Sequence, residues 1–150
     1  MGDIPKGVEA GFIATVLISL LFFAQKSLGI APEFDLLAML GRAAATTDII
    51  FVWILHFLVG TVMYGVLFAM FSPHLPGPKW LRGAQFGVLA WLAMMLAFLP
   101  AAGLPVFAMG MGPEIPVSAL IIHLIFGVTM GEVYHLLVHY FPGEVEEDKA

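Results

Sequence analysis

The chain contains one phrase twice, as Ile54-x-His56-x-x-x-Gly60-x-x-Met63 and as Ile121-x-His123-x-x-x-Gly127-x-x-Met130. Both copies lie in the middle of long apolar runs. Residues at positions i, i+4 and i+7 fall on one stripe of an α-helix, so each copy predicts a histidine, a glycine and a methionine on one helix face. We interpret the rest of the sequence as a frame that sets these two stripes at equal depth in a bilayer.

The composition indicates that the natural solvent of this chain is lipid. Of its 150 residues, 61% are hydrophobic and only 11% are charged, and the mean hydropathy is +0.99. Soluble domains are roughly half apolar and a quarter charged, and a fold this small could not bury so much apolar surface in water. The absence of cysteine excludes disulfides, thiolate metal sites and thiol catalysis. The net charge of −5 argues against nucleic-acid binding.

Four apolar stretches are long enough to cross a bilayer, because a membrane helix needs about 20 residues. They cover about residues 8–28, 49–71, 80–101 and 116–140. Together they predict a single integral membrane domain over residues 1–150, in which we expect the acidic tail 143–150 to be disordered.

The segments between the spans carry their own signals. Residues 33–45 predict a short interfacial helix, because the segment is acidic at its N-terminus and apolar on one side. Thr46, Thr47 and Asp48 are the candidate N-caps of the second span. Residues 104–116 are irregular, apolar and rich in glycine and methionine. Such a backbone is tolerated at membrane depth only where it packs on protein or lines a cavity.

The distribution of cations predicts the orientation in the membrane. An even number of spans places both termini on one side. That side carries Lys6, Lys79, Arg82 and Lys149, and the other side carries Lys26 and Arg42. Positive residues are more frequent in cytoplasmic segments, so we expect both termini in the cytoplasm.

A second repeated pattern predicts an internal duplication. The first span contains Lys6-Gly7-x-Glu9-x-Gly11-x-x-Ala14, and the third contains Arg82-Gly83-x-Gln85-x-Gly87-x-x-Ala90, at an offset of 76 residues. The second and fourth spans match at an offset of 67, because the second loop is shorter. The sequence therefore predicts an all-α membrane protein with two tandem hairpin repeats and a pseudo-two-fold axis along the membrane normal. The two Gly-x-x-x-Gly pairs predict close helix packing.

His56 and His123 form the first candidate site. Across a two-fold axis the two imidazoles would face each other within the membrane, where a polar ring is costly unless it is bonded or ligating. Gly60 and Gly127 would leave room beside them for heme b, a flat cofactor with two axial nitrogens. The two methionines of the phrase suggest copper(I) instead. Two further interpretations stay open: each imidazole donates to a neighbouring helix while glycine and methionine pack the core, or the pair lines a quinone or polar small-molecule site.

Glu132, His135 and His139 form the second candidate site, as possible ligands of a single Zn²⁺ or Fe²⁺ ion. They share one helix face at positions i, i+3 and i+7. Glu-x-x-His resembles the ligand pair of di-iron carboxylate bundles, but those proteins need two copies and this chain has one. The alternative is that both histidines lie at headgroup depth and that Glu132 pairs with Arg82 or Lys79.

The position of Glu132 also predicts a protein partner. It lies nine residues after His123, about 180° around the helix, so it faces away from the bundle if His123 faces into it. A carboxylate within the membrane does not face lipid unpaired. We therefore expect either a homodimer or a partner membrane subunit on the Glu132 face, or a side chain that reaches the interface.

The functional expectation is a non-enzymatic protein. The sequence has no G-x-S-x-G, no H-E-x-x-H, no P-loop and no cysteine. We expect an accessory or binding subunit of a larger membrane assembly, such as a respiratory complex, with His56 and His123 as a site for heme b or a metal. The alternative is a small oligomeric transporter or channel for a small molecule or a metal ion.

The whole chain resembles the small four-span bacterial inner-membrane proteins grouped as domains of unknown function, the YagU-like sort. The resemblance covers roughly residues 6–140. It rests on the hairpin repeat, on Leu55-His56-Phe57 and Ile122-His123-Leu124 with their following glycines, and on Arg82-Gly83 at the start of the third span. It implies a multi-pass protein of the bacterial inner membrane and implies no activity.

Overall fold

The computed structural model describes residues 2–28 and 35–141, and these residues form helices and turns without a strand. Four helices are long and apolar enough to cross a membrane: Ile4–Ser27, Ile49–His74, Lys79–Ala101 and Glu114–Tyr140. The predicted all-α fold with four spans is thereby confirmed. The acidic tail 143–150, expected to be disordered, lies outside the described residues.

Local capping explains where the first helices begin. In α1 (Ile4–Ser27) the Asp3 side chain accepts a hydrogen bond from the backbone N–H of Lys6. The short helix expected near residues 33–45 is α2 (Leu36–Ala43), and Asp35 caps it through the backbone N–H groups of Leu37 and Ala38. These carboxylates satisfy N–H groups that have no partner inside the helix.

The second span is interrupted in the middle of the membrane. It consists of α3 (Ile49–Phe57), the π-helical turn η1 (Leu58–Met63), α4 (Tyr64–Phe71) and a terminal 3₁₀ turn, η2 (Ser72–His74). Its N-cap is Asp48, one of the three predicted candidates, which accepts from the N–H groups of Ile50 and Phe51. The π turn was not predicted.

The third span contains a second π-helical turn, whereas the fourth is unbroken. The third comprises α5 (Lys79–Ala93), η3 (Met94–Phe98) and α6 (Leu99–Ala101). After the short 3₁₀ turn η4 (Val106–Ala108), α7 runs from Glu114 to Tyr140. The apolar connection before α7 packs on protein, as expected, because Phe107, Ala108 and Leu104 lie against buried Met95 and Leu99.

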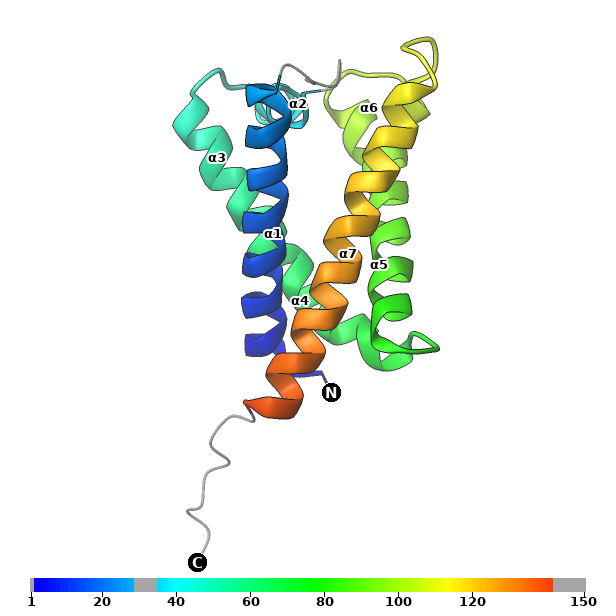
Figure 1. Ribbon diagram of the computed structural model, residues 1–150. Helices are drawn as coiled ribbons and strands as arrows, with labels where there is room; N and C mark the ends of the chain where they lie inside the picture. Colours follow the sequence, from blue (N-terminus) through cyan, green and yellow to red (C-terminus); the bar gives the residue numbers. More distant parts are fainter. Residues whose placement is uncertain (1, 29–34, 142–150) are drawn as a thin grey trace, which may run out of the picture.

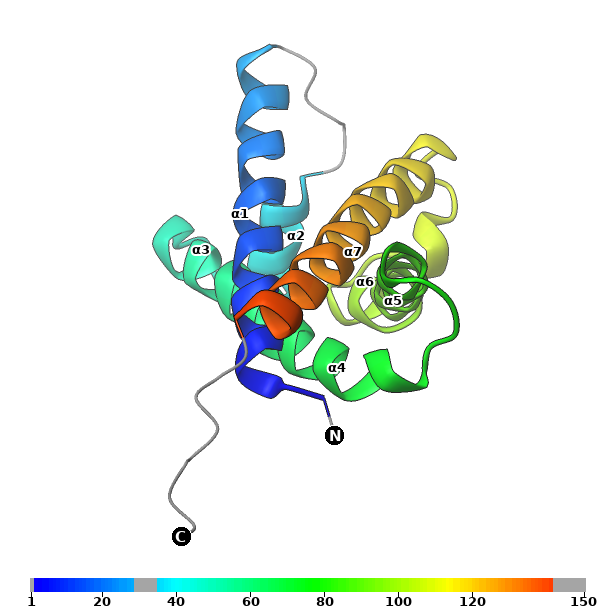
Figure 2. The ribbon, with the colours of Figure 1, turned by 60° about the horizontal axis from the view of Figure 1, so that its bottom comes forward.

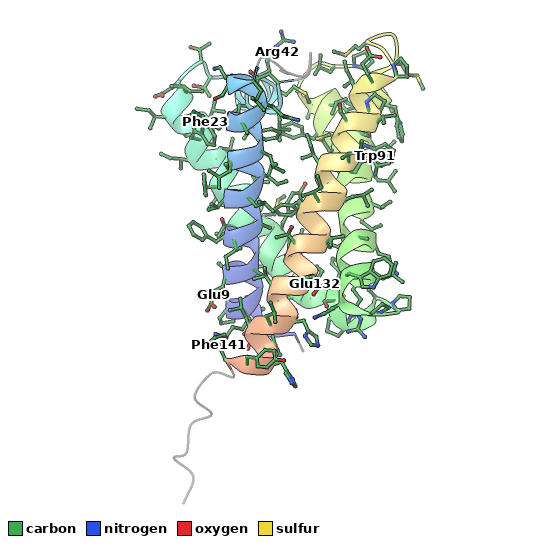
Figure 3. All side chains as sticks on the ribbon, viewed as in Figure 1. Glu9, Phe23, Arg42, Trp91, Glu132 and Phe141 are labelled. Carbon is green, nitrogen blue, oxygen red and sulfur yellow. The ribbon has the colours of Figure 1, made fainter. Side chains whose placement is uncertain are left out.

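The four spans form two layers, with α1 and α7 in one and the second and third spans in the other (Figures 1 and 2). Helix α1 packs on α4, η1 and α7, and α5 packs along α7. The two hairpins meet at the end where α1 begins and α7 ends, and they diverge toward α2 (Figure 1). Charged residues lie toward the two ends, with Arg42 at the α2 end and Glu9 and Glu132 toward the other (Figure 3).

Two clusters of buried side chains hold this arrangement. One joins the hairpins near the end where they meet, which we call the closed end. It consists of Ala10, Ala14, Ile18, Phe68, Phe86, Phe126 and Met130. The other lies at the α2 end and consists of Met39, Met94, Met95, Leu99, Ala108, Ile115 and Ala119. Through Met39, α2 is anchored to the second hairpin.

Within each hairpin the helices touch at glycines, as the Gly-x-x-x-Gly pairs predicted. A methyl group on Gly7 would meet the carbonyl oxygen of Gly65, and one on Gly83 would meet that of Gly127. The neighbours are backbone atoms, which cannot rotate away as a flexible side chain can. Glycine is therefore required for the close approach of these helices.

We expect Gly83→Leu to lower the free energy of unfolding by about 1–3 kcal/mol or more, because an inserted side chain must push α5 away from α7. Unfolding in mixed detergent and dodecyl sulfate micelles, followed by circular dichroism, measures this change. Val88→Leu on the same helix is the matched control, since Val88 is 36% exposed and the added carbon meets no packed neighbour. Equal stability of the two variants would contradict the packing argument.

Candidate functional site

A cavity of about 590 Å³ lies between the two hairpins and is lined by all four spans and by α2. His56 and His123 both line it, together with Gly60 and Met63 from the second span. Most of the other lining side chains are apolar, and none of them is Asp, Glu, Lys or Arg. Two imidazoles from distant parts of the sequence thus share one largely apolar space.

The environment of His56 fixes which of its nitrogens carries the proton. The ring is 9% exposed, and its Nε2 lies 3.1 Å from the Ser19 hydroxyl oxygen. That hydroxyl already donates its only proton to the carbonyl oxygen of Thr15, at 2.8 Å. With the Ser19 proton on Thr15, a neutral ring donates from Nε2 to Ser19, and Nδ1 keeps a lone pair. The rings of Trp53 and Phe57 lie edge-on to the imidazole and hold its orientation.

His123 is fixed in the opposite tautomer by its own helix. The ring is 8% exposed, and its Nδ1 lies 2.8 Å from the carbonyl oxygen of Ala119, one turn earlier in α7. A carbonyl oxygen only accepts, so Nδ1 carries the proton and Nε2 keeps the lone pair. Each of the two rings therefore keeps one nitrogen that can bind a metal or accept a hydrogen bond.

The two copies of the repeated phrase lie in different surroundings. Gly60 lines the cavity, and a methyl group there would overlap the Thr15 side chain of α1. Gly127 does not line the cavity but packs against Gly83 and Gly87. The difference arises because Gly127 faces α5, the other helix of its own hairpin.

The two methionines of the phrase also lie in different surroundings. Met63 lines the cavity and is 43% exposed, whereas Met130 is fully buried in the cluster at the closed end. Four of the six residues predicted for the first site therefore line the cavity, and Gly127 and Met130 do not.

The two π-helical turns contribute to the cavity wall, which the sequence analysis missed. The turn η1 supplies Val59, Gly60 and Met63, and η3 supplies Met94 and Ala97. A π turn widens the helix by one residue and is frequent at functional sites. The sequence signal that was available is the alanine series at positions 93, 97 and 101, which places small side chains on one wall.

Tyr64 is a further polar residue at the cavity that the sequence analysis missed. Its ring packs against Phe86 and Phe126, at centroid distances of 6.0 and 5.7 Å. Among the described residues its hydroxyl has no hydrogen-bond partner. The Tyr64 hydroxyl can therefore donate a hydrogen bond to a bound molecule. The unprotonated nitrogen of a neutral imidazole can only accept one.

The second candidate site has a different arrangement from a metal centre. Glu132 pairs with Lys79, with 2.9 Å between Oε2 and Nζ, which confirms one of the predicted ion pairs (Figure 3 shows Glu132). His135 and His139 are exposed and stack on each other with centroids 5.8 Å apart. Across residues 2–28 and 35–141, no three His, Asp or Glu side chains are placed to hold a metal ion.

The ion pair also bears on the expected partner subunit. A Glu132 carboxylate that faced lipid unpaired would need a counter-charge from a partner subunit. Lys79 supplies that charge from within the same chain. A homodimer or partner subunit on this face stays a prediction, but Glu132 does not require one.

We expect Ser19 and His56 to be energetically coupled by about 0.6–1.7 kcal/mol, the range of hydrogen bonds between membrane helices. A double-mutant cycle of Ser19→Ala and His56→Phe, with unfolding free energies measured in mixed micelles, gives the coupling. Ser27→Ala is the control, because the Ser27 hydroxyl bonds to Phe23 in its own helix. Strict additivity of Ser19→Ala and His56→Phe would refute the hydrogen bond between Ser19 and His56.

Comparison with known proteins identifies a family. The model of DUF6789, a family of unknown function, matches residues 1–141, so the chain belongs to this family. No curated protein and no solved structure matches the chain. The match agrees with a small membrane protein of unknown function, and it makes no link to the YagU-like proteins that the sequence resembles.

Proposed function

We propose that this member of the DUF6789 family is a non-enzymatic binding subunit that holds a cofactor in the cavity between its two hairpins. One observation carries the proposal: His56 and His123 line the same cavity, and each ring uses one nitrogen in a hydrogen bond within the chain and keeps the other without a partner among the described residues. A ring nitrogen that faces an apolar space is costly unless something binds it.

Heme b is the cofactor that we place first. A backbone carbonyl on the far nitrogen is a common way for proteins to orient a ligating histidine, and Ala119 does this for His123. The volume of about 590 Å³ falls within the ~300–1,000 Å³ of small-molecule sites. His56 is the second ligand through Nδ1, or through Nε2 once Ser19 is released.

Copper(I) is the second cofactor candidate. The two free nitrogens and the thioether of Met63 form a soft donor set of the kind that copper(I) favours. Met130, the other methionine of the predicted set, does not line the cavity and is fully buried in the apolar cluster that joins the hairpins. The test below separates copper from heme by metal analysis.

The apolar walls favour binding over transport. A small oligomeric transporter or channel needs a polar path across the membrane, and this cavity offers only Thr15, Tyr64 and the two imidazoles as polar side chains. No carboxylate lines the cavity to act as a general base or to orient either histidine.

The proposal includes an internal duplication with a pseudo-two-fold axis. The same kind of contact recurs in the two hairpins, because Gly7 meets the carbonyl of Gly65 and Gly83 meets that of Gly127. In the first helix of each hairpin these glycines are 76 residues apart, the offset of the repeated pattern. In the second helix their partners are 62 residues apart, whereas the repeated phrase has an offset of 67, so the helix contacts support the first half of each repeat alone.

For the location, we propose the bacterial inner membrane with both termini in the cytoplasm. Both ends of the described chain lie at the same end of the bundle (Figure 1). Lys6, Lys79 and Arg82 lie toward that end, which fits the cytoplasmic excess of positive residues.

We expect His123→Ala to abolish the cofactor signal of protein purified in mild detergent. The signal is a Soret band if heme b is bound, and stoichiometric copper by mass spectrometry if the metal is copper. His135→Ala is the matched control, because His135 is exposed at the other end of the same helix. Wild-type protein without either signal, or an unchanged signal in His123→Ala, would overturn the proposal.

We also expect mild detergent to extract the protein from the membrane as a complex, either a homodimer or an assembly with another membrane subunit. Helix α3 makes few contacts within its own chain and exposes large apolar side chains, including Ile50 and Ile54 at 69% and 60%. Native mass spectrometry from detergent micelles measures the assembly. A single species at the chain mass of 16.2 kDa would contradict the accessory-subunit part of the proposal.

A further inference from the structure

The cavity has an open side between the second and third spans, where its lining residues are exposed. On the other side α1 and α7 pack on each other, with a smaller hollow of about 230 Å³ between them, lined by Ile18 and Ile122 among others. The second and third spans touch near the closed end, where the Phe86 ring meets Tyr64 and Phe68 at 6.0 and 5.2 Å. Beyond these rings, the cavity residues Met63, Ala97 and Ala101 are exposed.

The open side lies at the depth of the hydrocarbon. Met63 belongs to η1 and Ala97 to η3, and both π turns are interior to helices that are long and apolar enough to cross the membrane. At the α2 end, Leu36 and Leu40 line the cavity and separate it from that surface of the protein. What abuts the opening is therefore lipid rather than water.

We infer that the cavity is loaded from the bilayer, through a portal between η1 and η3, and that its ligand is a lipid-soluble amphiphile. The inference rests on the proposed function in that it concerns the ligand of the same cavity. No charged side chain lines the walls, so a strongly hydrated ion or polyanion would lose its hydration there without compensation. An apolar body with one small polar or metal-bearing part satisfies both the walls and the two imidazoles. Of the two cofactors proposed above, heme b fits this description and a free copper(I) ion does not.

The alanines of the third span set the width of the portal. Ala93, Ala97 and Ala101 recur every four residues, so they lie on one helix face, and all three are exposed cavity residues. A large side chain at Ala97 would extend across the opening toward Met63. The neighbouring Leu96 is 54% exposed and does not line the cavity, so it provides a matched control position.

Photolabelling in nanodiscs tests the portal without reference to any cofactor. The probe is a phosphatidylcholine with a diazirine at the end of one acyl chain, and adducts are mapped by mass spectrometry. Met94 reports on the cavity, because it lines the cavity and is only 5% exposed, and Leu89 reports on ordinary lipid contact at 49% exposure. We expect adducts on both residues in His123→Ala, a background that lacks any cofactor bound through that ring.

Adding Ala97→Trp to this background should remove the Met94 adducts, and adding Leu96→Trp should leave them. Leu89 adducts and a single elution peak must persist in all variants, which shows that they are folded. Ala97→Leu is the milder second variant and should reduce the Met94 adducts in the same sense. Wild-type protein without heme or copper would sink the proposed cofactor but not the portal. Absence of Met94 adducts beside strong Leu89 adducts, or labelling that is equal in the two Trp variants, would overturn the portal.

Discussion

Contact between helix backbones at glycine is the constraint on which the rest of the structure depends. Helices in lipid gain little by hiding apolar side chains from one another, so close packing has to hold them together. Gly65 lies on Gly7, and Gly131 lies on Gly83, with backbone atoms as the nearest neighbours. These contacts hold the two helices of each hairpin together. The hairpins themselves meet at one end and diverge toward α2, which leaves the cavity between them (Figure 1).

The separation leaves polar groups inside the membrane that the chain bonds locally. Ser19 accepts from His56, and Ala119 accepts from His123, so each ring is held by its protonated nitrogen alone. The other nitrogen of each ring has no hydrogen-bond partner among the described residues, and both rings line the cavity. The arrangement combines a fixed ring orientation with an unused lone pair, which is how a prepared ligand differs from a merely buried histidine.

The sequence predicted those features that depend on local chemistry. Hydropathy located the four spans, the carboxylate of Asp48 marked the start of the second, and Gly-x-x-x-Gly marked the helix contacts. It did not predict the π turns, because a π register is stabilised by tertiary packing rather than by residue type. It also treated Met63 and Met130 as equivalent, although one helix carries a π turn and the other is regular. The two copies of the phrase therefore lie in different environments, because the backbone around them differs.

A hydrogen bond joins the start of α1 to α7, in which the backbone N–H of Asp3 donates to the Tyr134 hydroxyl oxygen at 2.8 Å. The partners are 131 residues apart, so this contact forms only after the fourth span has been made and inserted beside the first. Insertion of the fourth span therefore precedes closure of the bundle at this end.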